Sequence, residues 1–185
     1  MMPAYITGII WGSNFFNQKW IRYQVILSTV LHLLMSVEII FYPVLIKSDD
    51  TWFGWQQLAT KVQKIQSAHP GAFIFSADDY KTSAELNFYM DSMVYAQNVI
   101  GENALQFDFI GTDLNKLNGK EALFLDSDPG FNNDNKKNVI PVQLKTYFDS
   151  IVELDPVLIK NGGRTVRKFY VYNCSNYHYQ PPITK

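Results

Sequence analysis

The chain has 185 residues, of which 47% are hydrophobic and 15% aromatic, and this composition excludes a disordered tail. Sixteen basic and 17 acidic side chains give a net charge of −1, so we expect no nucleic-acid partner. One cysteine excludes an internal disulfide, and with three scattered histidines it does not form a standard structural zinc site. The first 46 residues carry only Lys19, Arg22 and Glu38 as formal charges. We therefore expect a membrane part, residues 1–46, followed by a polar domain, residues 47–185.

Two apolar stretches predict two transmembrane helices, over about residues 3–16 and 23–46. At ~1.5 Å per residue the second would span about 36 Å, which exceeds the hydrocarbon thickness of a bilayer. The loop between them, residues 17–22, contains Lys19 and Arg22, and short basic loops stay in the cytoplasm. The sequence therefore predicts a multi-pass protein of the inner (cell) membrane with residues 47–185 on the periplasmic or extracellular side.

The second predicted span has a polar stripe. On a helical wheel its members cover about half the circumference: Gln24, Ser28, Thr29, His32, Ser36 and Glu38. A carboxylate inside a span is costly, on the order of 3 kcal/mol, so Glu38 should face protein or water. The stripe favours packing against further transmembrane helices, and a direct role of His32 or Glu38 in substrate binding is the alternative.

The polar domain shows alternating helix and strand patterns. Apolar spacing and turn residues predict helices at 54–67, from Asp78 or Asp79 to about 90, and at 139–149. Strands are predicted at 72–77, 93–99, 121–126, 150–160 and 164–173, the last two joined by Asn161-Gly162-Gly163. This order predicts an α/β sandwich whose mixed sheet ends in an antiparallel hairpin.

Motifs of known chemistry are scarce. The sequence contains no phosphate-binding glycine loop, nucleophile elbow or zinc-protease helix. The loop 126–138 resembles a calcium loop, but Phe131 and Lys137 stand where glycine and glutamate are needed, so we predict no metal site. Asp78, Asp79 and Glu85 could serve acid–base chemistry. Capping of the following helix explains the aspartates more simply, and a pair with Lys81 across one helical turn explains Glu85.

Aromatic residues gather in two segments of the polar domain. They are Trp52, Trp55, Tyr80, Phe88 and Tyr89. Such rings stack on sugars, but they also form domain cores and anchor proteins at the membrane surface. The pattern alone leaves these functions open, with core and interfacial packing favoured.

Three segments carry a family resemblance: Thr51–Ala59 (TWFGWQQLA), Phe73–Tyr89 with its Tyr80-Lys81-Thr82-Ser83-Ala84-Glu85-Leu86-Asn87-Phe88-Tyr89 helix, and Leu117–Leu123 (LNGKEAL). They resemble the C-terminal extracytoplasmic domain of polytopic glycosyltransferases. These are the bacterial relatives of dolichyl-phosphate-mannose–protein mannosyltransferase, a group that includes the lipid A aminoarabinose transferase. Pro3-Ala4-Tyr5 resembles the start of a late membrane helix in that group.

The resemblance implies a GT-C fold and transfer of a hexose or pentose from a polyprenyl-phosphate donor to a lipid, glycan or protein acceptor. In that family the catalytic acids lie in the first extracytoplasmic loop, upstream of the matching region. We therefore expect a C-terminal fragment with no catalytic residue, which is inactive alone and works with upstream transmembrane helices. The chain itself should need no cofactor, and a divalent metal could assist only in the full-length enzyme.

The candidate substrate-binding residues are His32, Glu38, Trp52, Trp55, Tyr80 and Tyr89. The rival hypothesis is a non-catalytic, membrane-tethered binding or assembly module. The donor sugar, the acceptor and the oligomeric state do not follow from the sequence.

Overall fold

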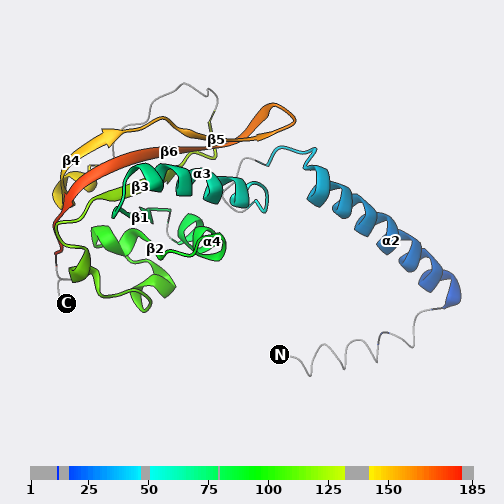
Figure 1. Ribbon diagram of the computed structural model, residues 1–185. Coiled ribbons are helices and arrows are strands. Elements are labelled where there is room, and N and C mark those ends of the chain that lie inside the picture. Colours follow the sequence, from blue (N-terminus) through cyan, green and yellow to red (C-terminus); the bar gives the residue numbers. More distant parts are fainter. Residues whose placement is uncertain (1–11, 13–16, 47–50, 79, 132–141, 181–185) are drawn as a thin grey trace. The chain divides into compact units, whose positions relative to one another are not determined.

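The computed structural model describes residues 12, 17–46, 51–78, 80–131 and 142–180, and its chain divides into two units, Met1–Val44 and Leu45–Lys185 (Figure 1). The first unit contains α2, Gln18–Phe41. This 24-residue helix has a mean hydropathy of 1.9 in its most apolar window and is long and apolar enough to cross a membrane. None of its residues is buried, so its apolar side chains face outward all round.

The bounds of α2 differ from the predicted span of 23–46. The Asn17 side chain accepts hydrogen bonds from the backbone N–H groups of Lys19 and Trp20, which starts the helix five residues earlier. Tyr42 adopts a left-handed conformation and precedes Pro43, which cannot continue a helix. Lys19 and Arg22 thus lie in the first turns of α2, and the prediction of a loop over 17–22 is wrong. The other predicted span, 3–16, lies almost entirely outside the described residues.

The second unit is built on a mixed sheet (Figure 1). Its described strands are β1 (Phe73–Ser76), β2 (Val94–Tyr95), β3 (Ala122–Ser127), β4 (Phe148–Glu153), β5 (Val157–Asn161) and β6 (Arg164–Tyr177). Their order is β2-β1-β3-β6-β4, and β5 also pairs with β6. β1 is parallel to β2 and β3, whereas β6 is antiparallel to β3, β4 and β5. The predicted mixed sheet is therefore confirmed.

The closing hairpin forms where the sequence predicts it, but the single strand predicted at 150–160 is wrong, because this segment is divided into β4 and β5. Gly162 and Gly163, between β5 and β6, have φ angles of 55° and 83°. A two-residue type I′ turn requires positive φ at both central positions, which glycine adopts without steric cost.

Helical segments lie against the sheet. They are α3 (Trp55–Ala68), α4 (Lys81–Tyr89), α5 (Leu144–Tyr147), and the 3₁₀ turns η1 (Gln97–Ile100), η2 (Leu105–Asp108) and η3 (Leu114–Leu117). α3 contacts α4 and β5, and α4 contacts β1. On one face of the sheet, Phe73, Phe75 and Phe124 form an aromatic core with residues of η1, η3 and α5. Because side chains alternate along a strand, the buried Ile74 and Leu123 point to the opposite face.

Two predicted elements are shorter than expected. The strand expected at 93–99 is reduced to β2, because Asn87 of α4 bonds the N–H and C=O of Val94 at 3.0 and 2.6 Å. These contacts cover the outer edge of the strand, which then turns into η1. The helix expected at 139–149 is seen as α5 alone, because Phe148 begins to pair with β6; residues 139–141 lie outside the described residues.

Candidate functional site

A pocket of about 310 Å³ lies beside the first turns of α3 and α4. It is lined by Thr51, Trp52, Trp55, Tyr80, Lys81, Ala84 and Glu85. The fold therefore brings together three of the predicted substrate-binding residues, Trp52, Trp55 and Tyr80. We call this hollow the aromatic pocket.

The two tryptophans have different environments. Trp52 is 45% exposed and offers an open ring, whereas Trp55 is 3% exposed and forms a fixed wall. The Trp55 indole N–H donates to the Thr51 carbonyl at 2.8 Å, which satisfies its polar atom. Trp52 is thus the more exposed ring of the two, and Trp55 holds the shape of the pocket.

Close packing fixes the turn that carries both tryptophans. Gly54 has a φ of 90°, and a Cβ placed there would lie 2.5 Å from Cγ2 of Ile159 in β5. Only glycine allows this approach, because a larger residue would clash and would be strained at that φ. Gly54 therefore anchors the start of α3 against the sheet.

Arg167 of β6 supports the wall from behind, a contribution that the sequence did not reveal. Its guanidinium lies 3.7 Å from the centroid of the Trp55 ring and 4.9 Å from that of Phe169. Its Nη1 donates to the Phe53 carbonyl at 3.3 Å, and the side chain is 5% exposed. The arginine acts on the pocket through Trp55 and the backbone of the turn.

Helix α4 supplies the other wall. Tyr80, Lys81, Ala84 and Glu85 line the pocket from the start of this helix, and the pairs separated by four residues share a helix face. Asp78 fixes this end of the helix, because its carboxylate accepts from the Thr82 N–H at 3.2 Å and from the Thr82 hydroxyl at 2.5 Å. Asp78 therefore bonds the first turn of α4 as predicted, although Tyr80 stands at the N-cap position, and Asp79 lies outside the described residues.

The lining combines an exposed indole and a tyrosine with one ammonium and one carboxylate group. Aromatic faces pack on the C–H surface of a sugar, and charged groups bond its hydroxyls. The described lining contains no serine, cysteine or histidine, and its ionisable groups are those of Tyr80, Lys81 and Glu85.

The remaining predicted residues lie elsewhere. Tyr89 is at the end of α4 and packs edge-on against Phe88, with ring centroids 4.9 Å apart, and it does not line the aromatic pocket. His32 and Glu38 belong to α2, in the other unit.

The polar stripe of α2 makes mainly local contacts. His32 Nδ1 lies 2.6 Å from the Ser28 carbonyl, and the hydroxyl groups of Thr29 and Ser36 donate to carbonyls four residues earlier. Glu38 Oε2 accepts from the Val44 N–H at 3.3 Å, and Oε1 is buried with no hydrogen-bond partner in the described part of the chain. These contacts satisfy most of the stripe within the helix itself.

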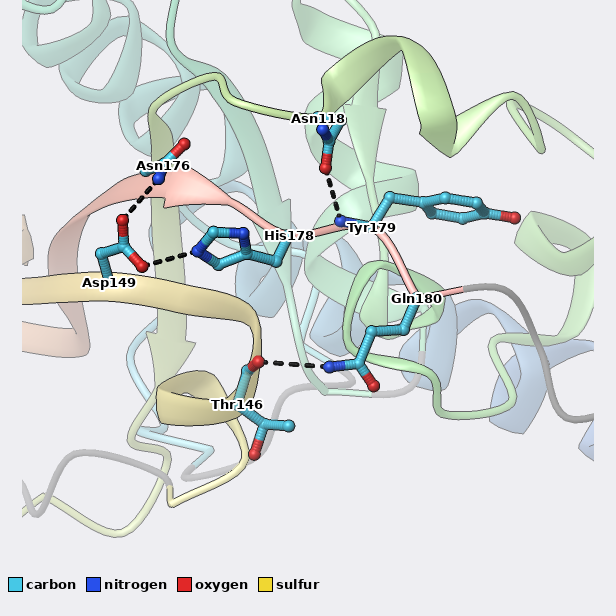
Figure 2. A network of polar contacts seen from close by, with 7 residues as sticks. All are labelled: Asn118, Thr146, Asp149, Asn176, His178, Tyr179 and Gln180. Atoms are coloured by element: carbon cyan, nitrogen blue, oxygen red, sulfur yellow. Dashed lines mark hydrogen bonds and ion pairs between the residues drawn. The ribbon is translucent and has the colours of Figure 1, made fainter.

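A second polar cluster joins the ends of β4 and β6 (Figure 2). His178 Nε2 lies 2.6 Å from Asp149 Oδ1, and the Asn176 amide donates to Oδ2 of the same carboxylate. Two hydrogen bonds lower the pKa of Asp149: the one from Asn176 has the larger effect, and the one from His178 the smaller. The side chains of His178 and Asp149 are both about half exposed. The cluster links the beginning of β4 to the end of β6.

The described residues contain no group of three or more His, Cys, Asp or Glu side chains placed to bind a metal ion. Cys174 is buried in the core, and burial raises the pKa of its thiol to about 12. Neither feature adds a reactive group to the aromatic pocket.

Comparison of the chain with family models, with curated proteins and with solved structures gave no match in any of the three.

Proposed function

We propose that this chain is the membrane-anchored sugar-binding region of a polytopic glycosyltransferase. In this proposal the enzyme moves a sugar from a polyprenyl-phosphate donor to a lipid, glycan or protein acceptor. The aromatic pocket contacts the sugar, and the reacting groups are supplied by other parts of the enzyme. The observation that carries the proposal is the grouping of Trp52 and Tyr80 with Lys81 and Glu85 around one pocket.

The chemistry of the lining supports a carbohydrate ligand. Trp52 exposes nearly half of its surface, enough to stack on one face of a pyranose ring. Lys81 donates and Glu85 accepts hydrogen bonds, so together they can bind neighbouring hydroxyls. A volume of about 310 Å³ lies at the lower end of the range for small-ligand sites and suits a single sugar residue.

The membrane part of the proposal rests on α2. We propose that α2 spans the inner membrane, that residues 3–16 form a second span, and that residues 47–185 lie outside the cytoplasm. Glu38 supports further helices as partners, because its Oε1 has no hydrogen-bond partner among the described residues and carboxylates within a bilayer face protein or water. Helical layers on the two faces of the mixed sheet would then form an extracytoplasmic α/β sandwich.

A second candidate function is a tethered binding or assembly module that takes part in no transfer reaction. The binding character of the described pocket lining favours it as much as it favours a transferase. Both candidates predict sugar binding and no transfer by the chain alone. They differ in whether added transmembrane helices from a transferase restore activity.

Binding is tested with the full chain in phosphatidylcholine nanodiscs and a panel of monosaccharides and polyprenyl-phosphate sugars. We expect saturable binding of at least one sugar by calorimetry. The Trp52→Ala variant should bind it about tenfold more weakly, equivalent to about 1.4 kcal/mol.

Tyr89→Ala provides the matched control, because Tyr89 is an exposed aromatic residue of the same domain that lies outside the pocket. Its affinity should equal that of the unaltered chain. Absence of binding to every sugar, or equal losses in both variants, would refute the proposed ligand.

A further inference from the structure

A short turn after η1 exposes several large apolar side chains to solvent. We call residues 105–111 the apolar turn. Phe109 is 86% exposed, Leu105 58% and Ile110 54%. Three large apolar side chains this exposed within six residues of sequence mark an interaction surface.

The base of the turn is firmly held. Phe107 is 5% exposed and packs with Ala96 and Ala104, and Tyr80, Ala84 and Met93 lie against this cluster. The Ala104 N–H donates to both Asp108 carboxylate oxygens at 3.0 Å, and the Asn98 amide donates to the Phe107 carbonyl at 2.8 Å. A fixed base means that the exposed side chains are presented outward by the fold.

The backbone of the turn is strained in a way that maintains this exposure. Leu105 has a φ of 50°, a conformation that costs a non-glycine residue about 1 kcal/mol or more. At the other end Gly111 has a φ of 67°, and a Cβ there would lie 2.6 Å from Met93. Strain of this kind persists where the surrounding structure imposes it and often marks a functional segment.

The partner that the rest of the chain indicates for the apolar turn is the lipid bilayer. α2 is long and apolar enough to span it, and in the sequence α2 precedes the domain that carries the turn. The charged residues nearest to the turn in sequence are mostly acidic, Glu102, Asp108 and Asp113. They disfavour an anionic partner, whereas insertion of Phe and Ile at a neutral lipid interface is favourable.

We infer that the apolar turn inserts Leu105, Phe109 and Ile110 into the interfacial region of the membrane that α2 spans. The inference rests on the proposed membrane span. Tyr80 and Ala84 both line the aromatic pocket and pack against the base of the turn. Insertion would therefore place the aromatic pocket close to the lipid headgroups.

The test uses the full chain in phosphatidylcholine vesicles with an environment-sensitive fluorophore on a single introduced cysteine. Cys174, the one native cysteine, is buried and does not compete for label. The label is placed in Phe109→Cys, in Val30→Cys within α2, and in Lys160→Cys at an exposed position of β5. Spin-labelled lipids then quench fluorophores that touch the bilayer.

We expect the labels at positions 109 and 30 to shift to the blue and to lose most of their emission to the quencher, while the label at position 160 stays unchanged. A water-exposed label at 109 beside a quenched label at 30 would overturn the inference and leave the sugar proposal standing. A blue-shifted but unquenched label at 109 would overturn it too, since a protein surface would then cover the turn. An unquenched label at 30 would refute both the span and the inference.

Discussion

The central carbon of the Arg167 guanidinium lies 3.7 Å from the centroid of the Trp55 ring. Arg167 and Trp55 are far apart in sequence, and their contact joins β6 to the first turn of α3. It is the long-range interaction that gives the aromatic pocket a rigid wall.

Replacing Arg167 by alanine should lower the free energy of unfolding by about 2 kcal/mol, because a desolvated cation–π contact and a hydrogen bond to the Phe53 carbonyl are both lost. Chemical denaturation measures the change. Arg164→Ala, at an exposed position of the same strand, is the matched control and should stay within about 0.5 kcal/mol of the unaltered chain. Equal effects of the two substitutions would contradict the role given to Arg167.

Gly54→Ala should destabilise the domain by about 2–3 kcal/mol, since it combines backbone strain at a φ of 90° with a clash against Ile159. Gly71 offers a close comparison, because its φ is 88° and a Cβ placed there would meet no atom within 4 Å. Gly71→Ala should therefore cost only about 1 kcal/mol, the backbone contribution. Thermal melts of both variants separate steric from conformational effects. Identical decreases in melting temperature would contradict the clash between Gly54→Ala and Ile159.

The Cys174 thiol should resist alkylation at pH 8 until the domain unfolds. Burial raises its pKa to about 12, so the native state holds the neutral, unreactive form. The unfolded thiol has an ordinary pKa near 9, so this contribution to stability is complete below pH 9 and declines as the pH rises from 9 towards 12. Mass spectrometry of iodoacetamide adducts should show one adduct in denaturant and almost none without it. Rapid labelling of the native chain would show that the site is open.

A reporter fused after Lys185 tests which side of the membrane the domain occupies. Lys19 and Arg22 lie at the start of α2, and basic residues favour the cytoplasmic side. Alkaline phosphatase, which folds only outside the cytoplasm, should therefore be active in the fusion. A fluorescent reporter that matures only in the cytoplasm should stay dark, and the opposite result would reverse the proposed topology.

Local patterns were sufficient for several elements of the fold. α3, β1 and β3 fall within one or two residues of their predicted positions, because their apolar spacing and flanking turn residues are strong. The β5–β6 hairpin follows from two adjacent glycines. β2 and α5 are shorter than predicted because contacts with other segments determine where they end. Asn87 covers the edge of β2, and β6 pairs with Phe148 at the end of α5.

The sequence identified candidate binding residues, but it did not show which of them lie together in one pocket. Of the six predicted substrate-binding residues, Trp52, Trp55 and Tyr80 line the pocket, and their grouping depends on how α3 and α4 pack. Arg167 carries no local signal, since an arginine in a strand usually faces solvent. Its burial over Trp55 follows only from the register of β6 and the close approach at Gly54.

The central claim, that the aromatic pocket holds the sugar, is tested most directly by photocrosslinking. A polyprenyl-phosphate sugar with a diazirine on the sugar ring is irradiated with the full chain in nanodiscs, and the labelled peptides are mapped by mass spectrometry. We expect adducts on the peptides that contain Trp52 and Tyr80, and these adducts should be competed away by free sugar and reduced in Trp52→Ala. Adducts found only on other peptides would contradict the assignment of the sugar to the aromatic pocket. So would adducts on these two peptides that persist unchanged in Trp52→Ala.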